Sequence, residues 1–236
     1  MIAPHLDDAA LSLGAAISRA TRCGVRVEVL TVFAGDVHSS EGASPHDRAS
    51  GFAAAGQAAA VRRQEDLEAC AHLGAVPVWL PFDDGLYEGT PGDEELAEAV
   101  AQSLGDPTGV LVPGWPLVQP DHVRVARLVV QRVRPSAPLG LFVEQPYAAF
   151  RRLSRTTVVS GRGALARQRP VGPASVRLDQ GSPWARAPAR PADWRAKLHA
   201  VRAYRSQLPR LRRWPIARIA LDEATRGGER VSWIGG

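Results

Sequence analysis

Cysteine and lysine are almost absent from this chain. Its 236 residues include two cysteines, Cys23 and Cys70, which are widely separated and belong to no CxxC pair. That spacing disfavours both a zinc–thiolate site and a disulfide framework. Lys197 is the only lysine, so arginine supplies every other basic side chain. We take this bias as a feature of composition and do not assign a function to each arginine.

Long apolar runs are also missing. The apolar run Ala9–Ser18 is far too short to span a bilayer, and it follows Asp7 and Asp8 instead of the basic residues of a secretory signal. No other segment comes closer to a membrane span. We therefore expect a cytoplasmic protein without a transmembrane segment.

The net charge of +5 hides a strong asymmetry between the two halves of the chain. Residues 1–118 contain 6 arginines and 17 acidic residues, whereas residues 119–236 contain 23 basic and 7 acidic residues. The halves can attract each other across an interface, or the basic half can hold an anionic substrate or partner. We favour the first interpretation. The arginines are dispersed and no array of base-stacking aromatic residues accompanies them, so we expect no nucleic-acid partner.

Strand-like and helix-like segments alternate through the first two-thirds of the chain. Apolar, β-branched runs predict strands, and 3.6-residue periodicity with helix-stop glycines predicts helices. The predicted strands are Val25–Phe33, Val76–Leu80, Gly109–Pro113 and Leu139–Gln145, and the predicted helices are Asp8–Arg22, Ala58–Leu73, Asp93–Leu104 and Pro120–Val133. This alternation indicates an α/β fold with a mostly parallel sheet and helices on both faces.

The remaining segments are less regular. Residues 35–56 form a long loop, which we interpret either as an active-site lid or as a disordered segment. Beyond residue 150 we expect an irregular C-terminal extension, with short strands at Thr156–Ser160 and Ser175–Leu178 and a helix at Ala192–Arg205. We expect one domain over residues 1–236, with a core at 1–150 and a C-terminal elaboration at 151–236. Since few residues precede the first helix, any first strand is very short.

The segment at residues 4–14 reads PHLDDAALSLG and lies where a strand would run into a helix. Open α/β sheets bind ligands at this carboxyl edge. His5 and Asp8 are three residues apart and can converge on one metal ion, which leaves Asp7 free to take a proton from an attacking water. Either aspartate can also cap the helix that begins here. Capping is compatible with metal binding, but it does not account for a histidine together with two aspartates.

A second candidate segment, Gln119-Pro120-Asp121-His122, follows the predicted strand Gly109–Pro113. Pro120 suits the first position of a helix and Asp121 suits its first turn, so the segment is also a well-formed helix start. His122 completes a His/Asp/His set with positions left open for water. That arrangement is typical of a catalytic metal site.

These segments carry a family resemblance. PHLDDAALSLG resembles the HxDD signature of the PIG-L/LmbE-like N-acetylglucosaminyl deacetylases, and QPDHVRVARLV resembles their HPDH segment. Four further stretches agree with the family in the same order: RRQED at 62–66 followed by Leu73-Gly74, FDDGL at 82–86, VEQPY at 143–147, and Lys197 followed by YRSQ at 204–207. Each motif is short, but together they are specific and span most of the chain.

The resemblance implies a Rossmann-like fold that binds one Zn²⁺ per chain through His5, Asp8 and His122. It also implies that Asp7 is the general base. Zinc would polarise an amide carbonyl and lower the pKa of its water toward 7, and Asp7 would take the proton. The implied reaction removes the acetyl group from a small N-acetylated amino sugar or a glycoconjugate.

Gln119 is the main departure from the family. Most members have a histidine there, which assists as a general acid or as an electrostatic partner. Glutamine can donate a hydrogen bond but cannot carry a proton at neutral pH, and loss of a general acid typically costs about 10²–10⁴-fold in rate. We count Gln119 and Asp121 with the catalytic segment and expect either that Asp7 returns the proton itself or that activity is low.

Three residues are candidates for the substrate pocket. Arg62 and Asp84 lie in segments that resemble the family, although an arginine on a helix can equally pair with a neighbouring acid. Trp115 is the one tryptophan of six that we expect to stack on a sugar, because it precedes the second metal segment.

Three functions are compatible with this sequence. We favour a zinc-dependent N-deacetylase of an amino sugar. The alternatives are a hydrolase of another small amide and a non-catalytic binding protein that keeps the fold. The non-catalytic binding protein is disfavoured, because loss of catalytic function would not selectively preserve all three metal ligands and the general base.

Overall fold

The computed structural model describes residues 1–35, 42–83, 91–149, 156–159, 165–168, 184–207, 219–220, 223–224 and 227–234. The strands are β1 Ile2–Ala3, β2 Glu28–Thr31, β3 Val76–Trp79, β4 Val110–Trp115, β5 Leu139–Val143, β6 Thr156–Val159, β7 Leu165–Gln168, β8 Ala185–Arg186 and β9 Arg230–Ile234. The strands β1, β2 and β3 pair in parallel in that order, and β4 pairs in parallel with β5. Because β1 lies against β4, the two groups run as neighbours.

Antiparallel strands extend the sheet beyond β5. The strand β9 pairs with β5, and β8 pairs with β9, both in antiparallel orientation. The strands β6 and β7 form a separate antiparallel pair. The C-terminal segment therefore contributes to the main sheet.

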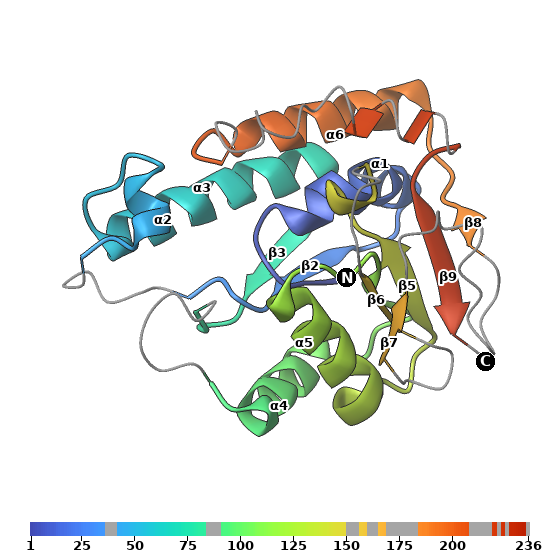
Figure 1. Ribbon diagram of the computed structural model, residues 1–236. Coiled ribbons are helices and arrows are strands. Elements are labelled where there is room, and N and C mark those ends of the chain that lie inside the picture. Colours follow the sequence, from blue (N-terminus) through green and yellow to red (C-terminus); the bar gives the residue numbers. More distant parts are fainter. Residues whose placement is uncertain are drawn as a thin grey trace.

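Helices cover both faces of the sheet (Figure 1). One layer contains α1 (Asp8–Arg22), α3 (Ala55–Leu73) and α6 (Pro191–Ala203), which pack against one another. The other contains α4 (Asp93–Leu104) and α5 (Pro120–Leu128), and α5 continues into a π-helical turn, η1 (Val129–Val133). Two short helices, α2 (Pro45–Arg48) and η2 (Tyr147–Ala149), complete the set. In the part of the chain that the structure describes, no helix is long and apolar enough to cross a membrane.

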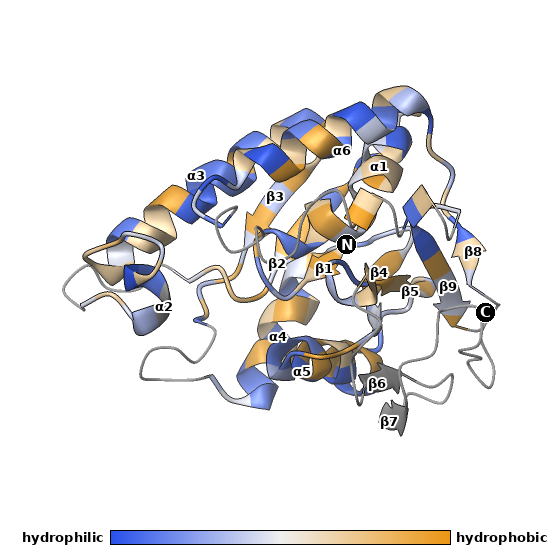
Figure 2. Cartoon of the chain, turned by 45° about the horizontal axis from the view of Figure 1, so that its top comes forward, coloured by the Kyte–Doolittle hydropathy of each residue, from blue (hydrophilic) through white to orange (hydrophobic). Residues whose placement is uncertain are grey.

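The core consists of two buried clusters. One includes Leu96 and Val125 from α4 and α5, and the other includes Leu11 and Tyr204 from the layer of α1 and α6. Figure 2 shows apolar colour on the inner strands β1, β3, β4 and β5, and polar patches along the outer helices α3 and α6. The predicted α/β class, with a parallel sheet and helices on both sides, is confirmed.

The structure also corrects several predicted boundaries. The strand β2 is shorter than the predicted Val25–Phe33, and the loop predicted at 35–56 contains α2 and the start of α3. The strands β8 and β9 were not predicted, because neither is a long β-branched run. The predicted strand Ser175–Leu178 lies outside the described residues.

The C-terminal segment holds α1 at a kink. Leu13 has non-helical dihedrals (φ −133°, ψ 20°), and the amides of Ala15 and Ala16 donate hydrogen bonds to the Glu229 carboxylate at 3.0 and 2.7 Å. Lys197 of α6 binds the same carboxylate at 2.7 Å. Glu229 thereby caps the second part of α1 as an acidic residue caps a helix start.

Candidate metal centre

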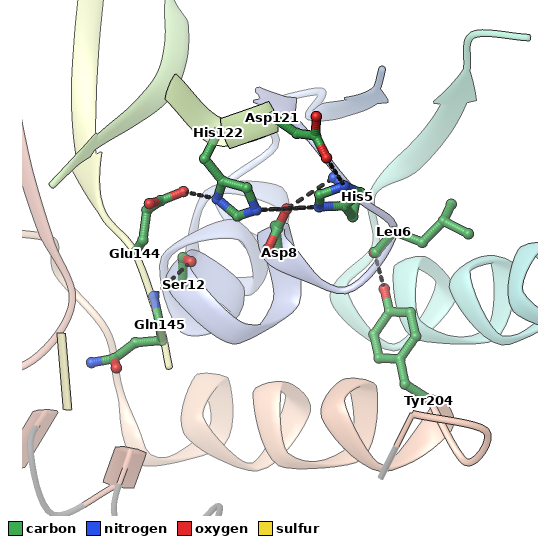
Figure 3. A network of polar contacts seen from close by, with 9 residues as sticks. All are labelled: His5, Leu6, Asp8, Ser12, Asp121, His122, Glu144, Gln145 and Tyr204. Atoms are coloured by element: carbon green, nitrogen blue, oxygen red, sulfur yellow. Dashed lines mark hydrogen bonds and ion pairs between the residues drawn. The ribbon is translucent and has the colours of Figure 1, made fainter. Parts of the chain in front are cut away.

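The two predicted metal segments meet at the carboxyl edge of the sheet. His5 and Asp8 follow β1, and Asp8 is the first residue of α1. His122 lies in the first turn of α5, in the segment that follows β4. Because β1 and β4 are neighbours, their carboxyl ends bring these side chains together, as Figure 3 shows.

Three donor atoms converge in this site. Nδ1 of His5 lies 3.2 Å from Nε2 of His122, and Oδ2 of Asp8 lies 3.5 Å from each of these nitrogens. Adjacent ligands of a tetrahedral zinc ion, with bonds of about 2.0–2.1 Å, are about 3.3–3.4 Å apart. The triangle therefore has the size of one face of a zinc coordination shell. His5, Asp8 and His122 are the one His/Cys/Asp/Glu group within the described residues that is able to hold a metal ion.

Each histidine is oriented by a carboxylate on its other nitrogen. Nε2 of His5 lies 3.4 Å from Oδ2 of Asp121, and Nδ1 of His122 makes a short hydrogen bond to Oε1 of Glu144. Such partners fix the ring and make the ligating nitrogen more basic. Asp121, predicted to act in catalysis, thus lies against a predicted ligand.

Glu144 was missed as a site residue by the sequence analysis. It follows β5 and is 2% exposed. Its place in VEQPY, directly after a strand adjacent to β4, was the available signal. Burial raises the pKa of Glu144, and the neighbouring His122 opposes that rise.

The carboxylates make the site attractive to cations. Burial lowers the pKa of His5, but hydrogen bonds to Asp121 and Asp8 outweigh burial and raise the pKa to about 10. Burial likewise lowers the pKa of His122, and Asp8 and Glu144 outweigh it. A site that favours protonated histidines favours positive charge, and a metal ion is able to replace those protons.

Asp7 does not act as a helix cap. It occupies the N-cap position of α1, yet its side chain makes no capping hydrogen bond, and Asp8 instead accepts the backbone amide of His5 at 2.8 Å. Burial and the adjacent Asp8 raise the pKa of Asp7 to about 6, while His5 opposes the rise. A carboxylate with this pKa is suited to exchanging a proton near neutral pH.

Gln119 forms a pair with Tyr147 beside the metal ligands. Gln119 is the N-cap residue of α5, and its side chain hydrogen-bonds the Tyr147 phenol. The Tyr147 ring packs edge-on against His122, with ring centroids 5.6 Å apart. Tyr147 comes from η2, just after the strand end that supplies Glu144. This tyrosine belongs to VEQPY, one of the stretches that resemble the family, and no role was predicted for it.

The predicted pocket residues have other surroundings. Arg62 pairs closely with Asp47 of α2, and its guanidinium lies 5.7 Å from the centre of the Phe52 ring. Trp115 is 3% exposed and packs in the core cluster, so its contact with a sugar stays a prediction. Asp84 lies outside the described residues.

Comparison with known proteins identifies the family of the chain. The sequence profile of the PIG-L family, described as GlcNAc-PI de-N-acetylase, matches residues 1–133, which is more than half of the chain. The chain belongs to the PIG-L family. No curated protein matches the sequence.

Solved structures of deacetylases match nearly the whole chain. A zinc-inhibited form of the teicoplanin deacetylase Orf2 is 25% identical, with 98% of this chain and 95% of that chain covered and a TM-score of 0.74. The A40926 pseudoaglycone deacetylase Dbv21 is 26% identical, with coverage of 99% and 94% and a TM-score of 0.74. An N,N'-diacetylchitobiose deacetylase from Pyrococcus horikoshii shares the fold at 18% identity, with coverage of 98% and 81% and a TM-score of 0.58.

Proposed function

We propose that this chain is a zinc-dependent N-deacetylase that removes an acetyl group from an amino sugar. The observation that carries the proposal is the triangle formed by His5, Asp8 and His122, with Asp7 adjacent to it and not engaged as a helix cap. A zinc ion held by these three residues would supply Lewis-acid activation of water and of the amide carbonyl.

The remaining chemistry is assigned to the chain's own residues. Asp7 accepts the proton of the attacking water, since burial and Asp8 raise its pKa to about 6. The same carboxylic acid returns the proton to the leaving amine, because Gln119 cannot carry one. Gln119 and Tyr147 supply polar hydrogens beside the site and orient the substrate or stabilise developing negative charge.

The proposed substrate class is an N-acetylated amino sugar that is part of a larger molecule. Support comes from the deacetylases Orf2 and Dbv21, which this chain matches over nearly its whole length and theirs. Their names specify teicoplanin and the A40926 pseudoaglycone. We also propose that Arg62, Asp84 and Trp115 belong to the part of the chain that selects among such substrates.

Acetate release from a small panel of amides tests the function. The panel contains N-acetylglucosamine, N,N'-diacetylchitobiose, the A40926 pseudoaglycone and N-acetylglycine, each incubated with zinc-loaded protein and with chelator-treated protein. We expect acetate from at least one sugar, none after chelation, and none from His122→Ala. Acetate from N-acetylglycine alone would show that the sugar class is wrong. A zinc-loaded protein that hydrolyses none of the four would favour the non-catalytic binding protein.

A further inference from the structure

The Tyr204 hydroxyl links the metal loop to a buried carboxyl group. Its oxygen lies 2.7 Å from the backbone carbonyl oxygen of Leu6 and 2.7 Å from Oδ1 of Asp66 (Figure 3 shows the contact with Leu6). Tyr204 is 1% exposed and ends α6, and Asp66 is fully buried on α3. Leu6 lies in the loop between His5 and Asp7, so α6 and α3 reach the proposed general base through one phenol.

The protonation state of Asp66 determines which neighbour receives the single hydroxyl hydrogen of Tyr204. A phenol has one hydrogen to donate, yet both neighbours of Tyr204 lie at hydrogen-bond distance and both are oxygens. If Asp66 is ionised, the phenol donates to the carboxylate, which is the stronger acceptor, and the Leu6 carbonyl faces an oxygen without a hydrogen between them. If Asp66 is protonated, its hydroxyl donates to Tyr204, and the phenol is free to donate to Leu6. Only the protonated form satisfies both contacts.

The surroundings of Asp66 favour that protonated form. Its other oxygen accepts the indole N–H of Trp79 at 2.7 Å, and no basic side chain forms an ion pair with it in the described parts of the chain. Burial raises the pKa of Asp66 to about 6, against the opposing hydrogen bonds from Trp79 and Tyr204. The other titratable groups nearby are the Cys70 thiol, on the same helix, and Asp7, beyond the phenol, and neither brings a positive charge. The nearest cation is the Arg63 guanidinium, which lies 5.6 Å from the centre of the Trp79 ring, donates to the Ala34 carbonyl and does not contribute to the pKa of Asp66.

We infer that Asp66 and Tyr204 form a positioning relay, in which a protonated Asp66 allows Tyr204 to hold the Leu6 carbonyl. The carbonyl of Leu6 and the amide of Asp7 belong to one planar peptide unit, so a fixed carbonyl fixes the backbone that carries Asp7. This catalytic consequence rests on the proposed deacetylase function. The relay itself does not depend on that function, because the proton on Asp66 also changes the free energy of unfolding.

Unfolding measurements test the relay without any activity. The folded pKa of Asp66 lies above its unfolded value, so the native state keeps a proton that the unfolded chain has released between about pH 4 and 6. Stability therefore falls as pH rises through that window and is level above it. In Asp66→Asn, the side-chain amide replaces the acid hydroxyl as donor to Tyr204, and this side chain no longer titrates. The ratio of the unfolding constants, wild type over Asp66→Asn, should rise roughly 20-fold from pH 4.5 to 7 in urea titrations. A ratio that is flat or falls would overturn the inference.

Three variants test the catalytic consequence. In Asp66→Asn, Tyr204 donates its hydrogen bond to the Leu6 carbonyl at every pH. Tyr204→Phe lacks this hydrogen bond at every pH, and the wild type loses it as Asp66 ionises. At pH 5 the kcat of the wild type should equal that of Asp66→Asn and exceed that of Tyr204→Phe about tenfold, with KM and zinc content unchanged. At pH 8 the wild type should approach Tyr204→Phe.

Ser206→Ala is the matched control for these variants. It removes a neighbouring bond between the end of α6 and α3, from the Ser206 hydroxyl to Glu65 at 2.7 Å, without touching the metal loop. It should lower stability and leave the pH profile of kcat unchanged. The ratio of unfolding constants can rise as expected while the ratio of kcat between Asp66→Asn and the wild type stays constant from pH 5 to 8. That outcome would show that Asp66 carries the proton but that the positioning role is wrong. If no amide is hydrolysed by any form, the deacetylase proposal fails and the unfolding ratio still decides the relay.

Discussion

The carboxylate of Glu144 accepts a hydrogen bond from Nδ1 of His122, and both side chains are almost fully buried. This bond leaves Nε2 of His122 as the nitrogen that faces His5 and Asp8. Glu144 lies 22 residues from His122 in sequence, and the pairing of β4 with β5 brings the two together. The sheet topology thus sets which nitrogen of His122 is available to a metal.

Glu144→Gln should weaken zinc binding about 10–100-fold, because glutamine is a weaker acceptor and no longer makes the ring more basic. Competition with a chromogenic chelator measures the Kd. Glu65→Gln is the matched control, since Glu65 is equally buried but binds Ser206 and not a metal ligand. Equal zinc affinity in wild type and Glu144→Gln would show that Glu144 has only a packing role.

Asp7→Asn should reduce hydrolysis by about two to four orders of magnitude and leave zinc content nearly intact. The reason is that Asp7 is next to a ligand but lies outside the triangle of donor atoms. Metal analysis and acetate release are measured on the same preparations, with Asp8→Asn as the comparison that loses zinc. Loss of metal in Asp7→Asn would mean that Asp7 is itself a ligand.

Glu229→Gln should lower the free energy of unfolding by about 2–4 kcal/mol, because a buried lysine loses one of two partners. Burial lowers the pKa of Lys197, but Glu223 and Glu229 outweigh burial and raise it. A lysine pKa raised by folding gives stability that is fully present below the unfolded value and lost only as pH rises through the folded one. The difference between variant and wild type should therefore be constant from pH 6 to 9.

Urea titration at pH 6, 7.5 and 9 measures this effect. Glu94→Gln serves as the control, because it removes an exposed pair with Arg132 and should change stability by less than about 1 kcal/mol. If Glu229→Gln lowers the free energy of unfolding no more than the control does, the ion pairs of Lys197 with Glu223 and Glu229 do not hold α1 at its kink.

The local parts of the site could be predicted from sequence, and its tertiary partners could not. His5 and Asp8 are three residues apart, and His122 lies in the first turn of a helix that follows a strand, so residue type and spacing were sufficient. Glu229 is 214 residues from the amide of Ala15 that it caps, and Tyr204 is 198 residues from Leu6. Such contacts depend on how the C-terminal elements α6 and β9 pack against the first helix in the tertiary structure. Single-sequence periodicity carries no information about that return.

The capping alternative for the two aspartates shows the same limit. Sequence alone could not separate an N-cap from a catalytic carboxylate, because both roles favour Asp at the start of a helix. The structure separates the two roles through the backbone dihedrals of Asp7 and the hydrogen bonding of both carboxylates. Asp7 has helical dihedrals (φ −91°, ψ −15°) and makes no capping bond, while Asp8 binds the amide of His5.

Gln119 and Tyr147 form the pair that distinguishes this chain from the family pattern. The amide of Gln119 can donate hydrogen bonds but cannot transfer a proton, so within this pair only the phenol of Tyr147 is able to do both. If the pair only stabilises negative charge, Tyr147→Phe should lower kcat about 10²-fold without changing the shape of the pH profile. An altered profile would instead assign a proton-transfer role to Tyr147.

Gln119→His restores the residue usual in the family and should add a group that titrates near neutral pH. Its imidazolium can protonate the leaving amine, so we expect the variant to keep zinc, to gain rate and to show a descending limb above pH 7, in addition to the fall in kcat that ionisation of Asp66 causes near pH 6. Metal analysis and kcat from pH 5 to 9 measure all three. Gln119→Asn is the control, because it shortens the amide and supplies no titrating group. If Gln119→His binds zinc but loses activity as Gln119→Asn does, the contact between Gln119 and Tyr147 is itself required, and Asp7 already returns the proton efficiently.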